Sequence, residues 1–208
     1  MVVEELAPGL WRWTAFHPEW KEEVGSVYYE APDAVVLVDP LVPSDETERF
    51  WAALDRDVER AAAPLHVLIT VFWHVRSARE IVERRDARVW APTRGRPAIE
   101  RRVGEVTDVF RAGDDLPGGI VPFKTARAAE VVFWIPAHRA LVPGDVILGA
   151  EEGGLRLCPA SWLPEKTSLD QLRKSLRPLL ELPVERVLVS HGEPVLAGGH
   201  DALAAVLD

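Results

Sequence analysis

Three polar residues that can bind a metal ion each follow a stretch typical of a buried strand: His74, Asp145 and His191. Ligands of layered sheets gather at the carboxyl ends of strands, so these side chains are expected to meet in one cleft. Two imidazoles and one carboxylate suit Zn²⁺ or Fe²⁺, and open positions leave room for an activated water. Asp39 also follows a strand and can orient a histidine through a hydrogen bond.

Each of these residues also has a purely structural interpretation. A histidine at a strand end is more often a hydrogen-bonded structural residue than a ligand. Asp145 lies in Pro-Gly-Asp and can hold a turn through its own backbone, and His191 precedes a glycine that suits a turn. Cys158 has no base beside it in sequence, which argues against a thiol nucleophile. Spacing alone therefore leaves the metal-binding and the structural interpretations open.

Composition predicts one globular domain over residues 1–208. The chain is 48% apolar and 27% charged, and its length suits a single core. A net charge of −9 argues against nucleic-acid binding, which needs clustered lysine and arginine. No apolar run approaches the ~20 residues that span a bilayer. The single cysteine, Cys158, fits a reducing cytoplasm, so we expect a cytoplasmic protein without a membrane partner.

Hydrophobic periodicity predicts sheets flanked by helices, an α/β or α+β architecture. A turn at Pro8-Gly9 is predicted to lead into an edge strand over Leu10–Trp13. The other predicted strands are Ser26–Glu30, Ala34–Val38, Leu65–Val71, Arg88–Ala91, Ile120–Lys124, Glu130–Ile135, Arg139–Val142 and Arg186–Ser190. Helices are predicted after the capping boxes Asp45…Glu48, Ser77…Glu80 and Ser168…Gln171, and over Asp201–Leu207. Thr14–Val24 is predicted to be a loop, and Thr93–Gly104 is left unassigned.

Five segments resemble the metallo-β-lactamase superfamily in order and spacing, over nearly the whole chain. They are Leu6–Arg12, Val35–Pro40, Val131–Pro136, Leu141–Gly149 and Arg186–Pro194. The resemblance implies a four-layer αββα sandwich with its site along one edge of the paired sheets. It also implies hydrolysis of esters, thioesters, lactams or phosphoesters by a metal-bound hydroxide. Asp145 matches the aspartate that bridges two metals, and His191 matches the final histidine ligand.

The chain departs from the family at its main ligand motif, His-x-His-x-Asp-His, which falls on Thr70–Ser77. If Thr70 sets the register, the ligand places hold non-ligands: Val71, Trp73, Val75 and Arg76. If the helix after Ser77 sets the register, His74 takes the last ligand place. The family's Gly-His-Thr-Pro-Gly falls near Thr125–Ala129, with Ala126 in place of the histidine. One metal half-site is therefore missing, and a dinuclear mechanism is not expected.

Two functions of different class follow from this departure. The first, which the missing ligands favour, is a non-catalytic or small-molecule-binding module without a cofactor. In that case Arg76 or Arg127 replaces the ion by pairing with Asp145, because a buried carboxylate needs a partner. Large apolar side chains then fill the vacated volume: Phe72, Trp73 and Trp162.

The alternative is a mononuclear metallohydrolase of an ester, thioester or phosphoester. One Zn or Fe ion is then bound by His74, Asp145 and His191, and Asp145 or Asp39 assists a bound water. Whether the chain is an enzyme is left open by the sequence, as is the substrate. A homo-oligomer is compatible with either function.

Overall fold

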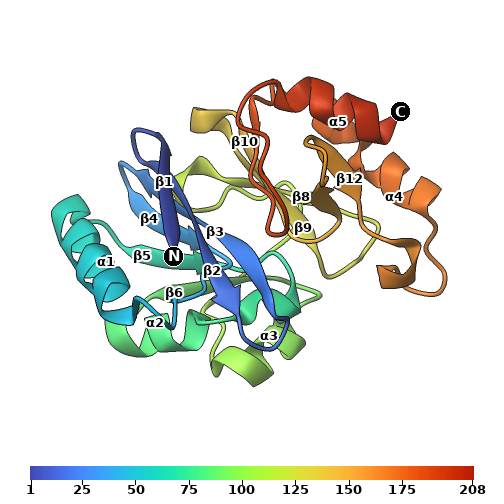
Figure 1. The fold of residues 1–208 in the computed structure, drawn as a ribbon. Coiled ribbons are helices and arrows are strands. Elements are labelled where there is room, and N and C mark those ends of the chain that lie inside the picture. Colours follow the sequence, from blue (N-terminus) through green and yellow to red (C-terminus); the bar gives the residue numbers. More distant parts are fainter.

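Apolar strands pair into two main sheets in the computed structural model, which describes residues 1–208 (Figure 1). The seven-stranded sheet has the order β1-β2-β3-β4-β5-β6-β7, the four-stranded sheet the order β13-β10-β9-β8, and β11 pairs with β12. The strands of the first sheet are β1 (Val2–Ala7), β2 (Leu10–His17), β3 (Glu22–Ala31), β4 (Ala34–Val38), β5 (Leu65–Leu68), β6 (Arg88–Pro92) and β7 (Asp108–Phe110). The others are β8 (Val121–Lys124), β9 (Val131–Ile135), β10 (Ala140–Pro143), β11 (Ile147–Gly149), β12 (Leu155–Leu157) and β13 (Arg186–Val187).

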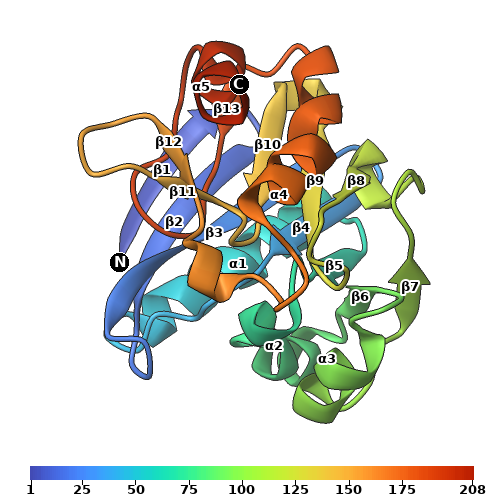
Figure 2. The same cartoon turned by 90° about the vertical axis from the view of Figure 1, so that its right-hand side faces the viewer.

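Helices cover the outer face of each main sheet, giving four layers in the order αββα (Figure 2). The helices are α1 (Thr47–Ala61), α2 (Ala78–Arg85), α3 (Arg96–Val103), α4 (Leu169–Leu176) and α5 (Gly199–Leu207). The first three lie against the seven-stranded sheet, and α4 and α5 lie against the four-stranded one. The expected α/β sandwich is confirmed. No helix is both long and apolar enough to cross a membrane.

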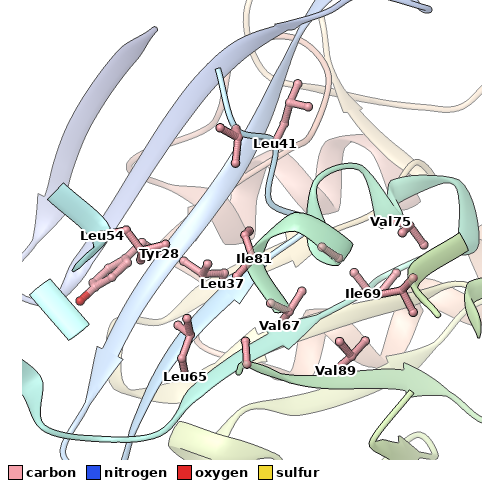
Figure 3. Close-up of a cluster of buried hydrophobic side chains, with 14 of the residues drawn as sticks. Tyr28, Leu37, Leu41, Leu54, Leu65, Val67, Ile69, Val75, Ile81 and Val89 are labelled. Atoms are coloured by element: carbon pink, nitrogen blue, oxygen red, sulfur yellow. The ribbon is translucent and has the colours of Figure 1, made fainter. Parts of the chain in front are cut away.

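Three apolar clusters hold these layers together. One lies between the seven-stranded sheet and its helices, where Leu54 of α1 lies beside Tyr28 and Ile81 of α2 lies near Leu37 and Val67 (Figure 3). The second lies between the two sheets, and the third between the four-stranded sheet and α4 and α5. Ile81 and Val67 are fully buried. Burial of such side chains contributes roughly 1.5–3 kcal/mol each, so the layers are fixed mainly by apolar packing.

Strand direction brings the candidate residues to one edge. β4 and β5 pair in parallel, so Asp39 and the segment after β5 leave the sheet at the same end. β10 and β13 also pair in parallel, which places the loops carrying Asp145 and His191 side by side. Carboxyl ends of parallel neighbours meet at one edge, and here the edges of both sheets contribute.

Two segments differ from the sequence-based prediction. The predicted loop Thr14–Val24 is wrong, because β2 and β3 stay paired until His17 meets Glu22. Pro18 lies in the hairpin turn, where it interrupts no ladder hydrogen bond. The unassigned segment Thr93–Gly104 contains α3, with a proline in its first turn, a position where the missing N–H costs nothing.

Only one of the three predicted capping boxes forms. Ser168 accepts from the N–H of Gln171, and the Gln171 side chain accepts from the N–H of Ser168. Helix α2 begins just after Ser77 as predicted, but the Ser77 hydroxyl accepts from the N–H of Val42 instead. Helix α1 begins at Thr47, too late for the box predicted at Asp45. Tertiary contacts thus override the local capping pattern at two helices.

Replacing Ser168 by alanine should lower the free energy of unfolding by about 0.5–2 kcal/mol, because the first turn of α4 loses its capping bond. Urea denaturation measures the change. Ser44→Ala is the matched control, since the exposed Ser44 caps no helix. An equal loss in both variants would show that the capping bond contributes nothing.

Candidate metal centre

Three side chains from different loops converge at the shared edge of the sheets. His74 lies in a 3₁₀ turn over Phe72–Val75, Asp145 in the β10–β11 connection, and His191 after β13. One ligand atom of each residue lies within 4.8 Å of the others, and all three residues are buried. The strand-end residues singled out by the sequence therefore share one site.

The carboxylate of Asp145 stands between the two imidazoles. Its Oδ1 lies 3.1 Å from His74 Nε2 and 3.3 Å from His191 Nε2. Both distances are short enough for an ion pair with a protonated imidazole. Burial favours the neutral acid, but the two imidazoles outweigh it and hold the pKa of Asp145 well below its usual range. The site thus offers an anionic oxygen between two imidazole nitrogens.

Asp39 fixes the orientation of His74. Its Oδ2 lies 2.8 Å from His74 Nδ1, and its Oδ1 accepts from the N–H of Thr70 at 2.9 Å. The Thr70 hydroxyl also donates to Asp39 Oδ2. Because a carboxylate accepts, Asp39 holds a proton on His74 Nδ1, which turns Nε2 toward Asp145. Burial opposes a charge on His74, yet Asp145 and Asp39 raise the pKa of this imidazole.

Arg76 joins three chain segments and does not pair with Asp145. Its guanidinium donates to the carbonyls of Gly25 and Asp39 and to the Ser190 hydroxyl. Burial, which removes water from the guanidinium, lowers the pKa of Arg76 to about 10, so the group stays charged at neutral pH. The predicted role of Arg76 as a substitute for the ion is therefore wrong. The carbonyls of Gly25 in β3 and of Asp39 just after β4 hold the guanidinium instead.

Arg127 also pairs elsewhere. Its Nη1 lies 2.7 Å from Glu130 Oε2, and its Nη2 donates to the carbonyl of Trp162 at 2.8 Å. The pairing of Arg127 with Asp145 is therefore wrong as well. Asp145 is held by Trp73, whose Nε1 donates to Oδ2 at 2.6 Å.

A second arginine holds the loop that carries His191. The buried Arg12 donates to the carbonyls of Val189 and Gly192, on either side of the histidine. Gly25 leaves room for this contact, since a Cβ there would lie 2.8 Å from Arg12 Nη2. Arg12 on β2 therefore positions His191 without touching the candidate site itself.

A pocket of about 480 Å³ opens onto Asp145 and His191, two of the three candidate residues. Its lining residues are Trp20, Glu22, Trp73, Arg127, Asp145, Trp162 and His191. Trp73 and Trp162 line the pocket as proposed from the sequence. Phe72 does not, because its ring packs toward the first core and lies under the guanidinium of Arg102. Cys158 is buried and its thiol pKa is raised by that burial, which fits an unreactive thiol.

The sequence did not single out two of the lining residues, Trp20 and Glu22. Trp20 lies at the tip of the β2–β3 hairpin, and its ring centroid is 5.7 Å from those of both His74 and His191. It stacks on His17 at 4.0 Å. Glu22 Oε1 lies 3.4 Å from His191 Nδ1. The signal available in the sequence was a tryptophan close to predicted strands. The prediction of a loop over Thr14–Val24 did not show that Trp20 lies at the tip of a hairpin beside the site.

The αββα layers and the cleft at their common edge define a class of fold, and comparisons with known proteins agree. The sequence profile of the metallo-beta-lactamase superfamily matches residues 4–208. No curated protein matches the sequence significantly. The chain belongs to the metallo-β-lactamase superfamily.

Solved structures support the same fold at low sequence identity. A metallo-beta-lactamase from Pontibacter korlensis is 15% identical, with a TM-score of 0.72 over 99% of this chain and 98% of that one. One from Hirschia baltica is 16% identical, with a TM-score of 0.69 and coverage of 99% and 95%. A beta-lactamase domain protein from Burkholderia ambifaria is 19% identical, with a TM-score of 0.70 and coverage of 98% and 74%.

Arg76→Met should lower the free energy of unfolding by at least about 2 kcal/mol, because each buried acceptor left without its donor costs roughly 1–3 kcal/mol. Arg79→Met is the matched control, since the exposed Arg79 pairs only with Glu83 and should change stability by less than about 0.5 kcal/mol. Urea denaturation compares the two variants. Similar losses would contradict the joining role of Arg76.

Proposed function

We propose that this protein binds one divalent metal ion through His74, Asp145 and His191 and hydrolyses a small ester, thioester or phosphoester. The observation that carries the proposal is the convergence of one potential ligand atom from each of the buried residues His74, Asp145 and His191, all within 4.8 Å of one another. Asp145 Oδ1 lies 3.1 Å from His74 Nε2 and 3.3 Å from His191 Nε2, so a cation among these atoms would satisfy the carboxylate and both imidazoles.

The donor set fits a borderline transition metal. Two imidazole nitrogens and one carboxylate oxygen suit Zn²⁺ or Fe²⁺, whereas Mg²⁺ and Ca²⁺ prefer oxygen ligands alone. A divalent ion held there would supply Lewis-acid chemistry, polarising an acyl or phosphoryl oxygen and making water nucleophilic near neutral pH. Ala126, Val71 and Val75 offer no donors for a second ion, so we propose a one-ion site.

The protein's own residues set the donor atoms in place. Asp39 keeps the proton on His74 Nδ1, and Glu22 is suited to hold one on His191 Nδ1. Trp73 occupies Asp145 Oδ2, which leaves Oδ1 for the ion. Asp39 is 3% exposed and already bound to Thr70 and His74, so we assign it an orienting role and not the activation of water.

The pocket supports a substrate with a flat apolar part. Trp20, Trp73 and Trp162 line it around the proposed ligands. Indole rings offer large rigid surfaces at a low cost in conformational entropy and exclude water from the reacting bond. The pocket of about 480 Å³ suits a small molecule better than a polymer chain.

A second candidate function, a metal-free module that binds a small molecule, is favoured by one observation. The Trp73 indole donates to Asp145, so part of the carboxylate is satisfied without an ion. We rank this candidate second because neither Arg76 nor Arg127 reaches Asp145 to replace the missing charge.

Purified protein exposed to excess Zn²⁺ and then desalted should retain about one ion per chain by elemental analysis. At free Zn²⁺ near 100 times Kd, binding should stabilise the fold by about 2.7 kcal/mol, seen as a rise in Tm that a chelator reverses. His191→Ala should lose both effects.

His200→Ala is the matched control, because the exposed His200 lies away from the pocket and bonds only the Leu180 carbonyl and its neighbour Asp201. Absence of bound Zn²⁺, Mn²⁺ and Fe²⁺, with a Tm that no chelator changes, would reject the metal site and leave the binding module.

The metal-loaded protein should hydrolyse at least one chromogenic aryl ester, thioester or phosphoester, and His74→Ala should reduce kcat/KM by at least about 100-fold, because catalysis needs a complete and positioned ligand set. The control is His138→Ala, which alters a half-buried histidine on the β9–β10 turn, away from the pocket. Stoichiometric metal without turnover of any of the three substrate classes would retain the ion and reject the hydrolase.

A further inference from the structure

Glu130 is a fully buried carboxylate that holds the backbone at Asp145. Its Oε1 accepts from the N–H groups of Asp145 at 2.5 Å and Val146 at 2.8 Å. Glu130 is 1% exposed. Gly144 permits this approach, since a Cβ there would lie 2.8 Å from Glu130 Oε1. Glu130, just before β9, thus holds the backbone at Asp145, whose carboxylate lies between the two imidazoles.

Arg127 completes the arrangement from the other side. It pairs with Glu130 Oε2, and its guanidinium lies 5.1 Å over the ring of Trp73. Trp73 in turn donates to Asp145 Oδ2. These contacts link the backbone of Asp145 to its own side chain. The backbone N–H binds Glu130, Glu130 pairs with Arg127, Arg127 lies over the Trp73 ring, and Trp73 donates to Asp145 Oδ2. One oxygen of Asp145, Oδ1, is left facing His74 and His191.

A gain in folding stability does not by itself explain the buried ion pair between Arg127 and Glu130. Removing water from two charges costs several kcal/mol per ion, and buried pairs often contribute no more than apolar residues of equal volume. Here the pair satisfies two backbone donors at one point of the chain, beside the residue whose carboxylate faces both imidazoles. That location favours a positioning role over a purely structural one.

We propose that Glu130 and Arg127 are positioning residues that hold Asp145 with Oδ1 directed at His74 and His191. The expected effect on Zn²⁺ affinity rests on the proposed metal site. The expected effect on the position of Asp145 rests only on the contacts described above. Neither residue touches the ion in this scheme. Glu130 acts through the Asp145 backbone, and Arg127 acts through Glu130 and Trp73.

Two double variants isolate the acceptor at position 130. Glu130→Gln/Arg127→Met removes both charges but keeps an oxygen that accepts from Asp145 and Val146. Glu130→Ala/Arg127→Met removes the same charges and the acceptor too. Competition with a chromophoric chelator should give a Zn²⁺ Kd at least about tenfold weaker for the alanine variant than for the glutamine variant, in line with supporting hydrogen bonds at metal sites.

A second measurement needs no metal. The solvent exchange of the Trp73 indole N–H, followed by NMR in the metal-free protein, reports its bond to Asp145. Trp73→Phe identifies the resonance. Exchange should be faster in the alanine variant than in the glutamine variant. Leu54→Ala controls for general destabilisation, because Leu54 is buried on α1 away from the site and its loss should alter neither readout at a temperature where the fold persists.

The outcomes separate the two proposals. If the wild-type protein binds Zn²⁺ and both double variants bind it equally, the positioning role is overturned and the metal site stands. If the wild-type protein binds no metal, the proposed function fails and indole exchange decides the positioning role alone. Faster exchange only in the alanine variant then supports it, and equal exchange in the two double variants overturns it.

Discussion

A carboxylate taken out of water must find donors or opposite charge, and Asp145 imposes that constraint on the whole site. It is 5% exposed, and desolvation of an ion costs several kcal/mol unless neighbours replace the lost water. Trp73 supplies a neutral donor to Oδ2, and two imidazoles approach Oδ1. Because those imidazoles come from opposite sheets, satisfying one charge requires the two sheets to keep a fixed relative position. The apolar core between the sheets provides that position.

Guanidinium groups connect the loops on which this arrangement depends. Arg12 and Arg76 donate to carbonyls and a hydroxyl on the segments that lead to His191 and Asp39, while Arg127 binds the carbonyl of Trp162. Carbonyls at strand ends lack partners within the sheet, and a planar group with five donors can satisfy several of them at once. The chain thus uses arginine to hold strand ends together, which explains why neither Arg76 nor Arg127 remains free to neutralise Asp145.

The layered fold and the convergence of His74, Asp145 and His191 could be predicted because both depend on local patterns. Apolar strands followed by polar residues place those residues at a sheet edge wherever neighbouring strands run parallel. The partners of the arginines could not be predicted, since each contact joins segments far apart in the chain, such as Arg76 and Ser190. The roles of Trp20 and Glu130 were missed for the same reason: each depends on which loop lies opposite, and local sequence does not encode that.

The turn after β5 explains how His74 reaches the candidate site. Thr70 binds Asp39 through its N–H and hydroxyl, which fixes the end of the strand. The next residues form a 3₁₀ turn over Phe72–Val75, tighter than an α-helix, and Arg76 then reverses the chain at φ +43°. This path brings His74 Nδ1 to the oxygen of Asp39 that also binds the Thr70 hydroxyl. The contact with Asp39 therefore identifies His74 as the histidine of the site, which counting residues along the motif does not.

Arg76, which takes the last ligand place when Thr70 sets the register, is turned toward Gly25 and Ser190 instead. The nitrogen, oxygen and nitrogen ligands of the proposed single-ion site are thus present although Val71, Trp73 and Val75 carry no side-chain metal ligands.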